Sequence, residues 1–208
     1  MMVDAHTHNL LATDAVISVE PAAFDPLQGR LYSVGLHPWN TEHFTDEQLA
    51  ALAQVASHPQ VVAIGETGMD ALRGATVERQ RSIFADVVRQ AQALGKPLIV
   101  HCVRRSQDII RVLRDQGVTV PCVIHGMRAN PRVAQQLLGA GCYLSFGVRF
   151  NPDTVRATPT HRLLIETDDS GAFIHQVAEA IAPLLHLDAP ALFALASRNL
   201  QAVLSLKQ

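Results

Sequence analysis

Six side chains of the types that bind metal ions stand at the ends of short apolar segments, far apart along the sequence. Imidazole nitrogens and carboxylate oxygens are common ligands of zinc and other divalent metals. For any single residue a structural role, such as that of a hydrogen-bonded buried histidine, is the simpler interpretation. The repetition at successive segment ends instead predicts a shared metal centre. The six residues are His6, His8, Glu66, His101, His125 and Asp168.

Four imidazoles and two carboxylates exceed the needs of one catalytic zinc ion, which takes about three protein ligands. We therefore expect two divalent ions that share a bridging carboxylate, Glu66. The two lysines, Lys96 and Lys207, do not end apolar segments and are poorly placed to supply a carboxylated bridge. Zinc, manganese, iron, nickel and magnesium all remain open, although magnesium matches four imidazoles poorly. The first ion is assigned to His6, His8, Glu66 and Asp168, and the second to Glu66, His101 and His125.

The apolar segments that carry these residues have the length and composition of buried parallel β-strands. His6 and His8 are two positions apart, so both would point to the same side of such a strand. Strands alternating with helices predict an α/β fold, a compact TIM-like (β/α) barrel of parallel strands with outer helices, whose strands all end at one mouth. A doubly wound open sheet is the alternative. The expected strands are 3–8, 15–19, 31–37, 61–66, 97–102, 121–125, 142–146 and 163–167.

Several segments between these strands carry helix signals, which are capping residues and an apolar stripe at helical spacing. The segment 20–30, between the second and third strands, is short and contains two prolines, so no full helix is expected there. The first expected helix runs from Thr45, which forms a capping box with Gln48, to about 57. The second spans 77–94 and ends at Gly95. The others run from Asn130 to Gly141 and from Asp188 to about 203.

The overall composition limits the class of protein. The 208 residues are 48% hydrophobic and 17% charged, which suits one domain over residues 1–208. No apolar run reaches the roughly 18 residues of a membrane span, and the N-terminus does not resemble a signal peptide. Three cysteines without a C-x-x-C pair indicate a reduced, cytoplasmic protein. We also expect a monomer without membrane attachment or an obligate protein partner. The net charge of −2 argues against tight duplex-DNA binding.

Six short motifs, in order and nearly end to end, resemble the signatures of the TatD family of metal-dependent hydrolases. The resemblance implies a TIM-like barrel with a divalent-metal site and hydrolysis of phosphoester bonds, typically as a deoxyribonuclease. It places the family's ligands on the six residues above and puts His37 near the substrate. Met69 and Met127 stand where leucine and phenylalanine are usual, and the chain resembles a short branch of the family. The motifs are DAHTH, GLHPW, AIGETGMD, PLIVHCVRR, IHGMRANP and LLIETDDS.

The chemistry of each side chain suggests a role in such a reaction. Asp168 is expected to be the general base, and Glu66 to act in catalysis as the bridging ligand. Arg104, three residues after His101, is the best candidate to bind phosphate oxygens through its planar guanidinium. Arg128 and Arg149 are weaker candidates.

Three further residues are expected around the ligands. Asp70 and Glu166 would accept N–H groups of ligand histidines and so fix their orientation. For Asp70, capping of a loop is the alternative role. Trp39 either stacks on a nucleotide base or packs at the rim.

The sequence therefore favours a divalent-metal-dependent phosphodiesterase, with DNA or a short oligonucleotide as the phosphoester substrate. One alternative is hydrolysis of an amide, a lactone or a carboxylic ester by the same metals, because the fold does not decide between these reactions. Another is a non-catalytic barrel scaffold, which the retention of all six ligand residues disfavours.

Overall fold

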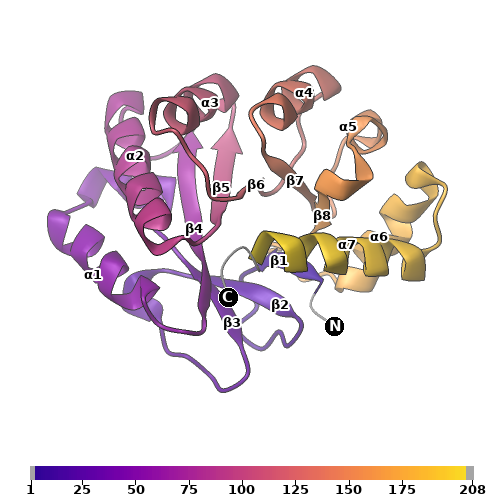
Figure 1. Ribbon diagram of the computed structural model, residues 1–208, viewed down its shortest axis with the longest axis horizontal. Helices are drawn as coiled ribbons and strands as arrows, with labels where there is room; N and C mark the ends of the chain where they lie inside the picture. The colour runs from indigo at the N-terminus through magenta and orange to yellow at the C-terminus, as the bar shows by residue number, and fades with distance from the viewer. Residues whose placement is uncertain (1–2, 205–208) are drawn as a thin grey trace.

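The computed structural model describes residues 3–204 and contains eight parallel strands closed into a barrel in sequence order (Figure 1). The last strand pairs with the first through Asp4 and Ile165, which closes the ring. This pairing confirms the TIM-like barrel and excludes the open sheet. The strands are β1 (Asp4–Thr7), β2 (Ala15–Val19), β3 (Leu31–Val34), β4 (Val61–Asp70), β5 (Leu98–Val103), β6 (Cys122–Ile124), β7 (Tyr143–Phe146) and β8 (Leu163–Ile165).

Helices fill most connections, and the α-helices lie around the outside of the strands in Figure 1. The connection from β1 to β2, residues 8–14, contains no helix, and the connection from β2 to β3 contains only η1, as its two prolines predicted. The helices are η1 (Pro21–Ala23), η2 (Pro38–His43), α1 (Asp46–Ala56), α2 (Val77–Leu94), α3 (Ser106–Asp115), α4 (Pro131–Gly139), α5 (Pro152–Ala157), η3 (Thr160–Arg162), α6 (Ile174–Ile181), η4 (Ala182–Leu185) and α7 (Ala189–Leu204).

The four helices expected from caps and stripes are present as α1, α2, α4 and α7. Asn130 caps α4 by accepting the Val133 N–H at 3.1 Å, and Asp188 caps α7 by accepting the Ala191 N–H at 2.8 Å. The helices α3, α5 and α6 were not expected. They are 10, 6 and 8 residues long, so each offers only a short stripe to a sequence pattern.

A small apolar cluster joins six strands to the last helix. Because residues of six strands in a closed barrel can meet only inside it, this cluster fills the interior, and α7 lies against it. Ile99, Val123 and Leu164 belong to the cluster and are followed two positions later by His101, His125 and Glu166, which therefore point to the same side of their strands. The polar site thus lies at the carboxyl-terminal end of an apolar interior. The cluster consists of Ala5, Val16, Ala63, Ile99, Val123, Leu164, Leu200 and Val203.

The strand that carries Glu66 differs from the prediction. We expected it to end at Glu66, but β4 continues to Asp70, so Glu66 lies inside the strand. The continuation depends on Gly65 and Gly68, which have φ values of 152° and 139°, where other residues are strained. A Cβ atom on either glycine would collide with the backbone oxygen of β5 opposite, at Ile99 or His101. The two glycines therefore let β4 approach β5 closely on both sides of Glu66.

The other strand ends were also placed imprecisely. His8 and His37 lie beyond the last residues of β1 and β3, which end at Thr7 and Val34, and His125 lies beyond β6. Their side chains are consequently carried by the first loop residues at the mouth of the barrel.

A lysine joins the end of α1 to the start of β4. The Lys96 ammonium group donates to the backbone oxygens of Ala56, His58 (3.3 Å) and Val61 (2.6 Å). Burial lowers the pKa of Lys96 from its usual value. Three carbonyl groups between the end of α1 and the start of β4 thus share one donor.

Replacing Lys96 with methionine is expected to destabilise the fold by about 1–3 kcal/mol, because it leaves partly buried carbonyl groups without a donor. Urea unfolding followed by circular dichroism measures this change. The exposed Arg198 of α7 provides a control, since Arg198→Met also removes one positive charge. Equal midpoints for the two variants would contradict the proposed role of the Lys96 contacts.

Among residues 3–204, no single helix is long and apolar enough to cross a membrane. Two consecutive helical segments, 174–185 and 189–204, reach that length and apolar composition only in combination, and the chain bends by 100° between them.

Candidate metal centre

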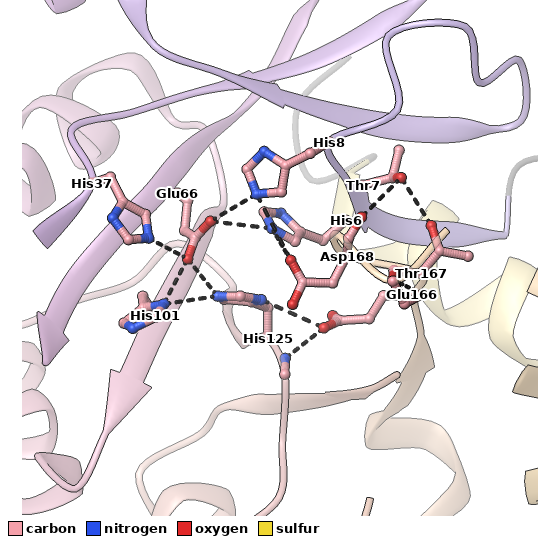
Figure 2. A network of polar contacts seen from close by, with 12 residues as sticks. His6, Thr7, His8, His37, Glu66, His101, His125, Glu166, Thr167 and Asp168 are labelled. Atoms are coloured by element: carbon pink, nitrogen blue, oxygen red, sulfur yellow. Dashed lines mark hydrogen bonds and ion pairs between the residues drawn. The ribbon is translucent and has the colours of Figure 1, made fainter. Parts of the chain in front are cut away.

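All six predicted ligands converge at the mouth of the barrel, around the carboxylate of Glu66 (Figure 2). One oxygen of this carboxylate, Oε2, faces the first strand. It lies 3.3 Å from Nε2 of His6 and 3.2 Å from Nε2 of His8. The same two nitrogens lie 3.6 and 3.7 Å from Oδ1 of Asp168. These four side chains form the set that the sequence assigned to a first ion.

The other oxygen of Glu66, Oε1, faces a different group of imidazoles. Nδ1 of His101 is 2.6 Å away and Nε2 of His125 is 2.7 Å away. Nε2 of His37 also lies 2.9 Å from this oxygen. His37 was predicted only to lie near the substrate, and the structure brings it into direct contact with the same oxygen.

Backbone contacts fix Asp168 against the first strand. The N–H of Asp168 donates to the carbonyl oxygen of His6 at 2.9 Å, and the N–H of His8 donates to the carbonyl oxygen of Asp168 at 3.1 Å. Asp168 has a φ of 55°, which is uncommon outside glycine. This conformation holds its carboxylate beside the two histidines.

The donor set is suited to divalent cations. Within the described part of the chain, both ring nitrogens of the fully buried His6 have no hydrogen-bond partner. Buried polar atoms are costly unless something engages them. Nitrogen and carboxylate oxygen atoms of His6, Glu66 and His125 lie within 4.8 Å of one another, as do those of His6, His8 and Asp168. The cluster could therefore bind metal ions.

The charges in the cluster are strongly coupled. Burial alone would lower the pKa of His125, but the negative charges of Glu66 and Glu166 raise it well above its usual value. Burial alone would raise the pKa of Glu66, but His125, His101 and His37 lower it well below its usual value. Contact with Glu66 also raises the pKa of His8. Glu66 is thus held as a carboxylate that attracts positive charge.

Asp70 lies directly behind His101. Its Oδ2 atom is 3.1 Å from Nε2 of His101 and accepts the indole N–H of Trp39 at 2.7 Å. Its Oδ1 atom accepts the N–H of Leu72 at 2.7 Å, so Asp70 also caps the loop. Burial works to raise the pKa of Asp70, but these hydrogen bonds lower it below its usual value. Both roles considered for Asp70 are therefore present in its contacts.

Glu166 lies behind His125 in the same way. It is fully buried, its Oε1 atom is 3.4 Å from Nδ1 of His125, and this oxygen accepts the N–H of Gly126 at 2.6 Å. One nitrogen of His125 therefore faces Glu66 and the other faces Glu166, which fixes the plane of the ring.

The sequence interpretation overlooked Asp4, although it opens the DAHTH motif two positions before His6. Burial raises the pKa of Asp4 to about 7. Its carboxyl group accepts the N–H of Thr167 at 3.0 Å and its hydroxyl at 2.6 Å. Asp4 thus joins β1 to the residue that precedes Asp168. Its place in the motif and its spacing from His6 were the signals that could have identified it.

The three arginines considered for phosphate binding differ in their exposure and in their contacts with the predicted ligands. Nη2 of Arg128 lies 4.0 Å from Oδ2 of Asp168, and its side chain is half exposed. Arg104 is exposed one residue beyond β5, with a φ of 55°, and Arg149 is exposed in the loop after β7. Arg128, first judged a weaker candidate, is therefore the one with a contact to a predicted ligand.

Replacing Asp70 with asparagine is expected to weaken metal binding about 10–100-fold, because His101 loses the charged acceptor that orients its ring. Titration of the metal-free protein against a competing chelator measures the dissociation constant. Asp115→Asn, at an exposed position, is the control. A dissociation constant within twofold of the wild-type value would leave Asp70 as a loop cap alone.

A closed parallel barrel with a histidine and carboxylate cluster at its carboxyl-terminal mouth is the architecture of barrel metal-dependent hydrolases. Residues 26–205 match the family described as TatD related DNase. The chain belongs to the TatD family of metal-dependent hydrolases.

Two relatives illustrate the extent of the similarity. The chain is 35% identical over 153 residues to the uncharacterized metal-dependent hydrolase TatD of Mycobacterium tuberculosis, an alignment that covers 67% of this chain and 58% of that protein. It is 31% identical over 147 residues to the 3′-5′ ssDNA/RNA exonuclease TatD of Cronobacter turicensis, covering 65% and 56%. The chain therefore aligns with little more than half of each relative.

A solved structure shares the fold along the whole chain. It is that of YJJV, a TatD homologue from Escherichia coli, with a TM-score of 0.85 over 99% of this chain and 98% of that one. The sequence identity is 19%, so this likeness concerns the barrel alone.

Proposed function

We propose that the protein hydrolyses phosphodiester bonds with two divalent cations held on either side of Glu66. The observation that carries the proposal is the division of contacts between the two oxygens of this carboxylate. Oε2 faces His6 and His8, whereas Oε1 faces His101 and His125. A carboxylate with ligand sets on both oxygens is suited to bridge two ions, as in two-metal phosphodiesterases.

The proposed ligands of the two ions follow this division. His6, His8 and Asp168 would hold the first ion with Glu66, and His101 and His125 the second. His37 touches the same oxygen of Glu66 as the second set, and its side chain is about one-sixth exposed, at 17%. We therefore assign His37 to the boundary between the second ion and a bound phosphate.

Two divalent cations held by these ligands would supply Lewis acidity and would lower the pKa of a bound water toward neutrality. Asp168 lies beside the first ligand set with its side chain one-fifth exposed, so its carboxylate can accept the proton of the attacking water. The oxygen of that water forms a bond to phosphorus as the bond to the leaving oxygen breaks. The proton held on Asp168 then passes to the leaving group or to solvent.

Arg128 is the residue proposed to bind the phosphate. Its guanidinium group is half exposed and 4.0 Å from Asp168, so an anion bound at the cluster would meet it. Guanidinium groups suit the charge that develops on phosphoryl oxygens. The contact of Arg128 with Asp168 favours it over Arg104 for this role.

The relative described as a single-stranded DNA and RNA exonuclease supports DNA or a short oligonucleotide as the substrate class. The net charge of −2 is compatible with a short single strand and not with extensive duplex contacts.

The proposal is tested with a panel of substrates and a defined metal. The metal-loaded protein is expected to cleave a phosphodiester reporter and short single-stranded DNA faster than carboxylic esters, lactones or amides. Turnover of carbonyl substrates alone would instead establish the second hydrolase reaction. Absence of turnover on every substrate, with metal bound, would favour the scaffold.

A further inference from the structure

A cavity of about 110 Å³ adjoins the metal cluster, and the proposed hydrolysis does not use it. It lies between η1, the loop after β3 and the first turns of α1. This is the part of the barrel where no full helix separates β2 from β3. His37 belongs both to the lining of this cavity and to the contacts of Glu66, so the cavity and the cluster share a wall.

The walls of the cavity are mostly apolar. Ala22 of η1, Ala51 of α1, Leu36 and Phe44 all line it. Small side chains at Ala22 and Ala51 leave space that larger residues would fill. Apolar walls beside a cluster of charges favour a flat ring with little charge of its own.

Besides His37, the polar side chains that line the cavity are those of Glu20, Asn40 and Gln48. Glu20 and Asn40 both line it, and the side-chain amide of Asn40 donates to Oε1 of Glu20. This contact occupies one of the two oxygens of the Glu20 carboxylate. A carboxylate accepts hydrogen bonds and repels carbonyl oxygens, so it favours a ring whose edge carries an amino group.

From these three observations we propose that the cavity is a subsite for one pyrimidine base of a nucleotide whose phosphate lies at the metal cluster, with cytosine favoured over thymine. The proposal rests on the proposed phosphodiesterase function and adds the base that the site recognises. The cavity of about 110 Å³ is smaller than the closed cavity of about 150 Å³ that binds benzene, but it is open on one side, so one ring can enter it in part and the two fused rings of a purine are too large for it. Glu20 would accept the N4 amino group of cytosine, a pairing that carboxylates make with this base.

Nucleotide binding to the zinc-loaded protein tests the subsite directly. Calorimetry with dCMP, dTMP, dAMP and 2-deoxyribose 5-phosphate is expected to show dCMP binding about tenfold more tightly than the others. Trp39 is the single tryptophan, and its ring lies 4.7 Å from that of His37, so its emission should change when dCMP binds. Equal affinities for dCMP and the baseless sugar phosphate would overturn the proposal.

Two variants that fill the cavity from different elements, η1 and α1, separate the subsite from general damage. Ala51→Phe and Ala22→Phe are each expected to reduce dCMP affinity to that of 2-deoxyribose 5-phosphate. Ala53→Phe, at an exposed position of the same helix α1, is the matched control and should bind dCMP normally. Glu20→Gln is expected to remove the preference for dCMP over dTMP. Unchanged affinity in both filled variants would overturn the subsite.

Hydrolysis of the dinucleotides dCpdC, dTpdT and dApdA distinguishes failure of the subsite from failure of the proposed function. Preferred cleavage of dCpdC, lost in Ala51→Phe through a rise in KM, would support both. Equal cleavage of all three, unaffected by Ala51→Phe, would overturn the subsite and leave the phosphodiesterase. Binding of dCMP that depends on Ala51, without cleavage of any dinucleotide, would retain the subsite and reject the phosphodiesterase.

Discussion

Replacing Glu66 with glutamine is expected to reduce hydrolysis by at least about 10³-fold and to lower the number of bound ions from the proposed two to fewer than one and a half per chain. Glutamine keeps the shape of the side chain but carries no negative charge and has only one oxygen. The five imidazoles that contact Glu66 through its two oxygens would therefore lose their common acceptor. Metal ions stabilise a transition state by several kcal/mol. Losing about 4 kcal/mol of this stabilisation lowers the rate by about 10³-fold.

Metal content by mass spectrometry and steady-state rates, measured on the same preparation, check this expectation. Glu179→Gln, at an exposed position of α6, removes the same charge away from the site and serves as the control. Thermal unfolding of both variants shows whether the fold persists. A Glu66→Gln protein with two ions and wild-type rates would reject the bridging role.

Asp168→Asn is the second variant with a large expected effect. Asparagine can still coordinate an ion through its oxygen but cannot accept a proton at neutral pH, so kcat should fall by about 10²–10⁴. The contacts of His101 and His125 with Glu66 do not involve Asp168, so the second ion should remain bound. A rate equal to that of the wild type, with metal bound, would show that Asp168 is not the base.

The adjacent residue offers a close control for this variant. Asp169 follows Asp168 directly and is exposed, so Asp169→Asn changes the same net charge one residue away. It is expected to retain metal content and kcat. The pH dependence of kcat provides a further test, because loss of a general base removes the acidic limb of the profile, whereas a purely structural defect lowers the rate at every pH.

The sequence alone was sufficient to predict the barrel and the six side chains that meet at its mouth. Both follow from local patterns, since continuous apolar runs mark strands buried on two sides and parallel strands in a barrel all end at one face. Helices with clear caps, such as the one opened by Asn130, were also predictable, because a cap depends on neighbouring residues only.

The tertiary structure decided the features that depend on contacts between distant segments. The extension of β4 past Glu66 depends on the close approach of Gly65 and Gly68 to β5, and no local pattern reports that approach. The contact of His37 with Glu66 depends in the same way on how the loop after β3 packs against β4. The approach of Arg128 to Asp168, at 4.0 Å, likewise joins two loops that are distant in the sequence.

There is a physical reason why some of these features could be predicted from the sequence and others could not. Side chains alternate between the two faces of a strand, so a few adjacent residues show which side chains point to the inside of the barrel. Which oxygen of Glu66 each imidazole meets depends on the stagger of neighbouring strands and on loop paths, which sequence neighbours do not determine. The sequence by itself predicted six donors of the candidate metal centre, and only the closed barrel brought His37 to the same carboxylate and decided how the donors divide around it.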